Sequence, residues 1–228
     1  MASRTALASA RRRFAALTSL FLLIFLVQAT QPAPAAAATI TANDLLAGLT
    51  VQAEVSVGYD RSLFPHWIDA DGDSCDSREE ILISESTSAP VLGTACKVIS
   101  GNWNSWYDGA SWTNPSDVDI DHVVALKEAW DSGASAWTTA KRTRYANDLD
   151  YAWSLDAVTD NVNASKSDRD PAEWLPPLTT VRCDYAIHWT AVKYRWSLSI
   201  NTAEKTALTN LFAGTCGERS ISVPPAGS

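Results

Sequence analysis

The chain has 228 residues, of which 18 are lysine or arginine and 26 are aspartate or glutamate, so its formal net charge is −8. A negative whole-protein field repels a polyanion and argues against a protein that wraps nucleic acid over most of its surface. A locally positive cleft can still hold phosphates.

The first 38 residues have the layout of a secretory signal peptide. Four arginines precede an apolar run over residues 14–27, and a stretch of small residues ends at Ala38. The run is shorter than the about 20 apolar residues that a transmembrane helix needs. We therefore expect cleavage near Ala38 and a secreted, soluble mature chain: 228 minus 38 leaves 190 residues, with 14 basic against 26 acidic ones and a net charge of −12. This length suits one domain over residues 39–228.

The first half of the mature chain predicts little regular structure. Residues 42–44 are suited to cap a short helix with three leucines. An Asp-rich segment over residues 69–76 follows, and residues 78–83 leave it as a helix or a strand. Residues 97–99 predict a short strand, and the Gly, Asn and Pro residues over 101–115 predict irregular chain.

Most of the predicted helix lies in the second half. Residues 118–126 begin with alternating apolar and polar side chains, as a strand does, and run into a helix over 127–130. Further elements follow in chain order: a helix over 137–149, a strand over 155–158, a short helix that Thr159 or Asp160 caps, an amphipathic helix over 182–197 and a last helix that Asn201 and Glu204 open with a capping box and Gly214 ends. The predicted fold class is α+β with few strands.

Four cysteines are present, and an even number in an exported chain predicts disulfides. Three pairings are formally open, and closeness in sequence favours Cys75 with Cys96 and Cys183 with Cys216. No C-x-x-C spacing occurs, so a zinc or redox site on these cysteines is disfavoured.

The segment around Asp121 and His122 carries the chemistry that is easiest to interpret. It places a carboxylate beside an imidazole at the end of a predicted strand, and a polar turn with Asn163 and Lys166 follows about 40 positions later. A hard cation such as Mg²⁺ takes oxygen ligands, and a neutral imidazole can take a proton from water. The set suits phosphodiester hydrolysis.

The run Asp119–Val124 resembles the first strand of HNH endonucleases, the ββα-metal group, and the run Asn163–Asp168 resembles the helix that supplies their asparagine. The likeness extends to secreted bacterial HNH endonuclease family proteins through four further segments, namely Asp71–Glu80, Ala129–Ala134, Tyr145–Leu149 and Asp184–Ala186 with Trp189. The resemblance implies a ββα core, with a small antiparallel hairpin surrounded by helices and an insertion over residues 127–149.

Carried over by position, the resemblance makes Asp121 a metal ligand, His122 the general base and Asn163 the second metal ligand or the residue that orients it. Arg78 and Lys166 become candidates for contacts to substrate phosphates. Because no second histidine lies near Asn163, the set favours Mg²⁺, or Mn²⁺, over zinc. The resemblance implies an endonuclease that acts on DNA, with RNA left open, and we expect a monomer.

Each feature also has a simpler interpretation. His122 can be a structural histidine bonded to Asp121 or Asp119, and His66 and His188 are interpreted as packing or surface residues. Residues 69–80 place three aspartates and Glu80 at the spacing of an EF-hand loop, but Ser74 replaces the expected glycine, so a disulfide-anchored turn that presents Arg78 toward the cleft is preferred.

The ten tryptophans have two interpretations. Core packing is favoured for most of them, such as Trp130, Trp137, Trp189 and Trp196, while Trp103, Trp106 and Trp112 can instead form a stacking surface. The rival function is therefore a non-catalytic secreted module that binds cell-wall glycan or calcium.

Overall fold

The structure, a computed structural model, describes residues 38–224. The predicted signal peptide lies outside these residues except for Ala38, and it stays a prediction. Within the described part of the chain, no helix is both long and apolar enough to cross a membrane.

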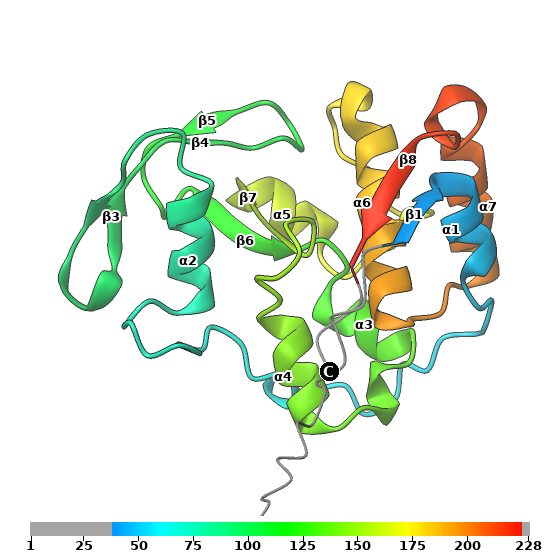
Figure 1. The fold of residues 1–228 in the computed structure, drawn as a ribbon, viewed down its shortest axis with the longest axis horizontal. Helices are drawn as coiled ribbons and strands as arrows, with labels where there is room; N and C mark the ends of the chain where they lie inside the picture. Colours follow the sequence, from blue (N-terminus) through cyan, green and yellow to red (C-terminus); the bar gives the residue numbers. More distant parts are fainter. Residues whose placement is uncertain (1–37, 225–228) are drawn as a thin grey trace, which may run out of the picture. The chain divides into compact units, whose positions relative to one another are not determined.

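The described strands form four separate two-stranded antiparallel sheets (Figure 1). The pairs are β1 (Ala38–Thr41) with β8 (Ser220–Val223), β2 (Val91–Leu92) with β3 (Val98–Ser100), β4 (Trp103–Asn104) with β5 (Ser111–Trp112), and β6 (Val118–His122) with β7 (Leu155–Thr159). The prediction of a mixed α and β fold with small antiparallel hairpins is confirmed. The pairing of β1 with β8 joins two ends of the described chain that the sequence did not connect.

Seven α-helices accompany these sheets in the described residues. They are α1 (Ala42–Gly48), α2 (Ser77–Ser84), α3 (Leu126–Asp131), α4 (Thr139–Ala146), α5 (Asp160–Lys166), α6 (Arg182–Trp196) and α7 (Thr202–Leu211). Each overlaps a helix that was predicted, and residues 78–83, which were left as helix or strand, lie in α2.

The helix caps follow from local side-chain hydrogen bonds. The side chain of Asp76 accepts from the backbone of Arg78 and Glu79 at the start of α2. Asn201 and Glu204 form the predicted capping box at α7. The first helix differs by one residue, since Thr41 is its cap. Thr159 precedes α5 without a side-chain cap, because its hydroxyl bonds Asp108 and Trp112 instead.

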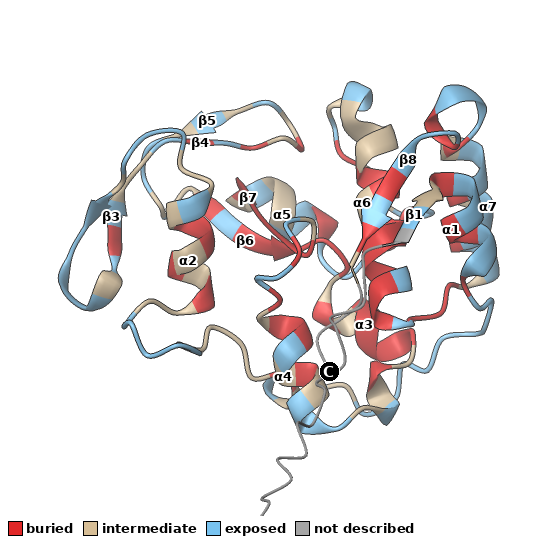
Figure 2. Cartoon of the chain, viewed as in Figure 1, coloured by how far each residue is buried: buried red, intermediate tan, exposed pale blue. Residues whose placement is uncertain are grey.

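Two apolar clusters hold the described chain together (Figure 2). The larger one surrounds α6, whose Tyr185 and Trp189 side chains are fully buried. Burial of one such side chain stabilises the fold by about 1.5–3 kcal/mol. The smaller cluster packs α2 and β3 against one face of the β6–β7 pair, through Leu82 and Trp103 among others. The β6–β7 pair is thereby held from that face by apolar packing.

The strands β6 and β7 and the helix α5 follow one another in the order strand, strand, helix. In the register, Asp121 is opposite Asp156 and His122 is opposite Leu155. Helices α3 and α4 lie between the two strands in sequence, in the region where an insertion over residues 127–149 was predicted. Asp160 begins α5 directly after β7, which brings Asn163 and Lys166 back beside β6.

A buried cation joins α3, α6 and α7. The Lys193 ammonium is fully buried, 2.6 Å from a Glu128 oxygen and 2.7 Å from a Glu204 oxygen. It also donates to the Ser132 hydroxyl and the Ser199 carbonyl. This saturated network fixes the helix that follows β6 to the C-terminal helices.

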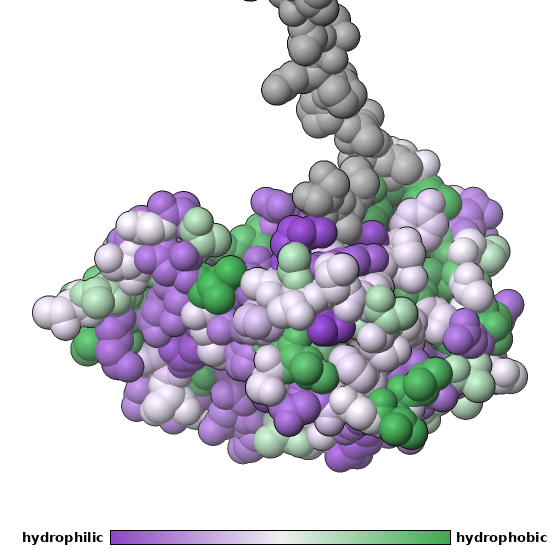
Figure 3. All heavy atoms as spheres, turned by 90° about the horizontal axis from the view of Figure 1, so that it is seen from below, coloured by the Kyte–Doolittle hydropathy of each residue, from purple (hydrophilic) through white to green (hydrophobic). Residues whose placement is uncertain are grey.

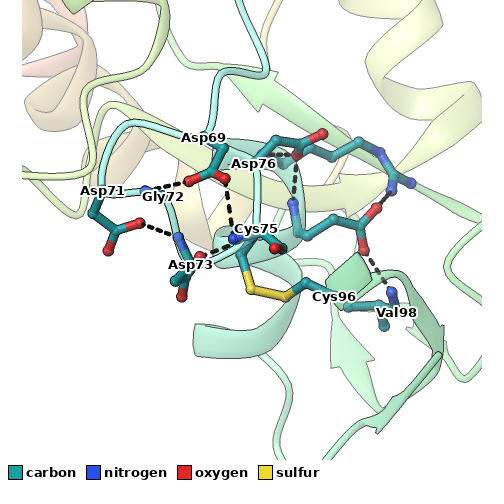
Figure 4. Close-up of a disulfide and its surroundings, with 11 residues drawn as sticks. Asp69, Asp71, Gly72, Asp73, Cys75, Asp76, Cys96 and Val98 are labelled. Carbon is teal, nitrogen blue, oxygen red and sulfur yellow. Dashed lines mark hydrogen bonds and ion pairs between the residues drawn. A yellow bond between two sulfur atoms is a disulfide. The ribbon is translucent and has the colours of Figure 1, made fainter. Parts of the chain in front are cut away.

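Both predicted disulfides, Cys75 with Cys96 and Cys183 with Cys216, are present. The first one anchors the acidic segment, in which Asp69 and Asp73 accept hydrogen bonds from backbone amides of the same loop (Figure 4). It ties this turn to the short 3₁₀ helix Thr94–Cys96, which ends two residues before β3. The preferred interpretation of residues 69–76 as a disulfide-anchored turn is confirmed.

None of the ten tryptophans is exposed. Trp103 donates its ring N–H to the Leu82 carbonyl, and Trp112 donates to the Thr159 hydroxyl. On the face drawn in Figure 3, hydrophobic residues form separate patches among hydrophilic ones. The packing interpretation is therefore supported, and Trp103, Trp106 and Trp112 do not form an exposed stacking surface.

Candidate active site

Asp121, His122 and Asn163 line one cleft, which has a volume of about 450 Å³. Asp121 and His122 end β6, and Asn163 lies in the middle of α5. The antiparallel pair and the helix that follows it therefore bring together three residues that are far apart in sequence. The remaining wall includes Tyr59, Arg61, Lys127 and Asp168.

His122 is buried and its ring is held from three sides. Its Nε2 lies 2.9 Å from the Ala146 carbonyl at the end of α4, and the rings of Trp67 and Tyr145 lie 5.6 and 6.4 Å from it. A carbonyl only accepts, so Nε2 carries the hydrogen and Nδ1 keeps its lone pair. His188, in contrast, stacks on Trp153 at 4.2 Å, and His66 bonds the Phe64 carbonyl, as expected of packing residues.

Burial lowers the pKa of His122 to about 3, although its hydrogen bond to Ala146 opposes that effect. The positive charges of Arg61 and Lys166 lower it further. The imidazole is therefore neutral across the physiological range, which is the form that accepts a proton.

Asp121 is buried and fixed by two donors. Its Oδ1 lies 2.8 Å from the Lys166 ammonium, and its Oδ2 accepts from the Tyr107 hydroxyl at 2.7 Å. Burial raises the pKa of Asp121, while Lys166 and Tyr107 act in the opposite direction. The ion pair leaves this part of the cleft without net charge and fixes the orientation of the carboxylate.

Asn163 is half-buried and bonded to a second carboxylate of β6. Its Nδ2 donates to Asp119 Oδ2 at 3.1 Å. With the nitrogen used in this way, the amide oxygen remains as an acceptor. Asp119 and Asp121 alternate with Ile120 along β6, so both lie on the same face of the strand.

The donor set fits a hard divalent cation. The cleft offers carboxylate and amide oxygens from Asp121 and Asn163, and no second histidine or cysteine lines it. Such cations take oxygen ligands and keep several waters, so two protein ligands are sufficient.

Lys166 and Arg78 do not have the positions expected of residues that contact a substrate phosphate in this cleft. Lys166 is completely buried, and its ammonium is used by Asp121 and the His122 carbonyl, so it has no surface for a substrate phosphate. Arg78 does not line this cleft. It bonds Glu79 and the Pro115 carbonyl and lies in a separate hollow with Lys97. The disulfide-anchored turn thus presents Arg78 elsewhere.

The acidic loop is separate from this cleft. Asp69, Asp71 and Asp73 can bring carboxylate oxygens within 4.8 Å of one another, and Asp73 and Glu80 form a similar group with the sulfur of Cys75. That sulfur belongs to a disulfide, and the aspartates accept backbone hydrogen bonds. A calcium site there was the less favoured interpretation, and the hydrogen bonds and the disulfide account for this loop without one.

Sequence reasoning missed three residues of the site. Tyr107 and Arg61 reach it from segments without a recognisable motif, and neither had a signal in the sequence. Lys127 had one, since it lies only five positions after His122 in a helix that begins at Leu126.

The family comparison matches residues 76–211 to the GmrSD restriction endonucleases, C-terminal domain, which is 136 of the 228 residues. The chain belongs to this family. The matched range contains β6, β7 and α5 and therefore Asp121, His122 and Asn163. The family is one of nucleases, so the cleft lies in a nuclease-type domain.

An uncharacterized secreted protein of Arthroderma benhamiae is 50% identical to the GmrSD-type chain over 177 residues, covering 77% of this chain and 85% of that protein. This relative is fungal, so the likeness is not confined to bacteria. No solved structure matches the chain.

Proposed function

We propose that this chain is a secreted, metal-dependent HNH endonuclease that hydrolyses phosphodiester bonds in DNA. The observation that carries the proposal is the convergence of His122, Asp121 and Asn163 on one cleft of a GmrSD-type domain. The order of strand, strand and helix around that cleft supports the HNH assignment.

His122 is the general base. The Ala146 carbonyl holds Nε2–H, which leaves Nδ1 to take a proton from a water molecule. The water oxygen then forms a bond to phosphorus, the bond from phosphorus to the departing sugar oxygen breaks, and that oxygen takes up a proton.

Asp121 and Asn163 hold the divalent cation, for which Mg²⁺ is the best fit. When bound, the cation supplies positive charge that stabilises the phosphate and the departing oxygen. Lys166 and Tyr107 hold the Asp121 carboxylate in place, so its oxygen atoms need no reorientation. Asp119 orients Asn163 through the bond to its amide nitrogen.

The direct test is cleavage of supercoiled plasmid DNA by the purified mature chain, beginning after Ala38. Nicked and linear DNA should form with Mg²⁺ and should not form with EDTA, and Mn²⁺ should support the reaction in parallel samples. Single-stranded DNA and RNA measured beside it define the substrate range. No cleavage with either metal would contradict the proposal.

Export is part of the same proposal. It is supported by the signal-like residues 1–38, by the two disulfides and by the fungal relative, which is named as a secreted protein. Expression of the full chain should yield a product in the medium whose N-terminus lies near Ala38. Retention of residues 1–38 in an exported product would contradict the predicted cleavage.

A further inference from the structure

One wall of the cleft carries the positive charges of Arg61 and Lys127. Tyr59 and Arg61 line it together with Lys127 from the first turn of α3. Tyr59 and Arg61 precede residue 76, where the match begins. Tyr59 and Arg61 therefore belong to a segment that precedes the family-matched range.

The segment that holds Arg61 is anchored firmly against helices α3 and α4. Trp130 donates its ring N–H to the Val57 carbonyl at 3.1 Å, and Arg142 donates to the Leu63 carbonyl at 2.9 Å. Phe64 is fully buried, and the ring of Tyr59 packs edge-on against Trp130. Asp60 caps the short 3₁₀ turn Arg61–Leu63. Arg61 thus stands on a fixed support, which lowers the entropy cost of binding through it.

The charged side chains of the cleft differ in whether they already form an ion pair within the protein. Lys127 is ion-paired with Asp131, and Asp121 is neutralised by Lys166. Arg61 is exposed, and within residues 38–224 it forms no ion pair with a carboxylate. Its guanidinium is therefore the cleft's most available positive charge.

Arg61 lines the same cleft as His122, Asp121 and Asn163. A guanidinium presents a planar fork of N–H donors that matches two oxygens of a phosphate. An anion held by Arg61 in this cleft would share the cleft with His122.

We propose that Arg61 binds a phosphate group of the nucleic-acid strand that lies in the cleft, with Lys127 as a second, weaker contact. The inference rests on the proposed function. It also accounts for phosphate binding by a chain with a net negative charge, because the contact is local. Arg61 takes the role that the sequence assigned to Lys166 and Arg78.

The test measures binding without cleavage. A fluorescein-labelled DNA oligonucleotide is titrated with mature His122→Ala protein in EDTA by anisotropy, at several salt concentrations. Adding Arg61→Ala should weaken binding about tenfold at low salt and reduce the slope of log affinity against log salt by about 1. Arg61→Lys should retain part of the affinity. Arg144→Ala changes an equally exposed arginine outside the cleft and should leave both values unchanged.

The outcomes separate the two proposals. If Arg61→Ala binds DNA with the affinity and salt slope of its parent while the unmodified enzyme cleaves, the inference is wrong and the proposed function stands. If the unmodified protein neither cleaves nor binds DNA or RNA, both are wrong. In the active enzyme, Arg61→Ala should raise KM more than it lowers kcat, and melting temperatures equal to the parent's would show that the fold is intact.

Discussion

The Lys166 ammonium lies 2.8 Å from Oδ1 of Asp121, and both side chains are buried between α5 and β6. The same ammonium donates to the His122 carbonyl at 3.0 Å. One cation therefore joins the helix of the site to the last two residues of its strand. Lys166 therefore holds Asp121 and the His122 backbone in position and does not contact the substrate.

Replacing Lys166 with Met should destabilise the fold by about 3–5 kcal/mol, because it leaves the buried Asp121 carboxylate without its cation. Urea unfolding measures the loss. Lys205→Met, at an exposed position of α7, is the matched control and should change stability little. The double variant Lys166→Met with Asp121→Leu should recover part of the loss, since no charge is then left unpaired. A loss below about 1 kcal/mol for the single variant would contradict the buried ion pair.

Tyr107→Phe tests the second donor to Asp121 without changing the packing. The variant loses the 2.7 Å hydrogen bond to Oδ2, which should cost about 1.5–3 kcal/mol of stability because the acceptor is charged and buried. Cleavage should fall several-fold at limiting Mg²⁺ as the carboxylate becomes less fixed. Tyr194→Phe, on a half-exposed ring, is the control. Parental stability and parental metal dependence together would show that the hydroxyl does not position Asp121.

Asn163→Ala should raise the Mg²⁺ concentration for half-maximal cleavage by about tenfold or more, because it removes one of two protein ligands. Asn161→Ala changes an exposed asparagine of the same helix that does not line the cleft. Metal titrations of the cleavage rate compare the two variants. Equal metal requirements in both would argue against Asn163 as a ligand.

Two neighbouring carboxylates, Asp156 in β7 and Glu85 beside it, should make stability depend on pH. Burial raises the pKa of Glu85 to about 7 and raises that of Asp156, its neighbour, well above the ordinary range. A carboxyl group whose pKa is higher in the folded than in the unfolded state stabilises the fold at pH values below its unfolded pKa, near 4.5. This stabilisation is lost as the pH rises to about 7. Glu85→Gln keeps an acceptor for the Ala157 amide but removes the charge.

The Glu85→Gln variant should therefore melt close to the parent at pH 4.5 and several degrees above it at pH 8, with the difference growing between these values. For a chain of this size about 1 kcal/mol shifts the melting temperature by about 2–4 °C. Glu173→Gln, at an exposed carboxylate, should show no such trend. A difference that is constant with pH would contradict the raised pKa.

The helices could be predicted because their signals are local. Asn201 with Glu204 forms a capping box whatever surrounds it, and the apolar spacing of α6 appears in the sequence alone. The β1–β8 pair could not be predicted, since it joins segments about 180 residues apart and such pairing leaves no local pattern.

The site could be predicted only where its residues carry a local motif. Asp121, His122 and Asn163 carry a motif, and the fold brings them to one cleft. The resemblance made Lys166 a candidate for a phosphate contact, but its burial depends on the strand beneath it, which the sequence does not reveal. Arg61 comes from a segment whose position is set by its packing on Trp130 and Arg142, which no periodicity reveals.

The most direct test of the account is the cleavage rate of His122→Ala on plasmid DNA with saturating Mg²⁺. Loss of the general base should lower the rate by at least about 100-fold while melting temperature and Mg²⁺ affinity stay close to the parent. His66→Ala, a histidine that does not line the cleft, should cut at nearly the parental rate. A folded His122→Ala protein that cleaves at the parental rate would contradict the central claim.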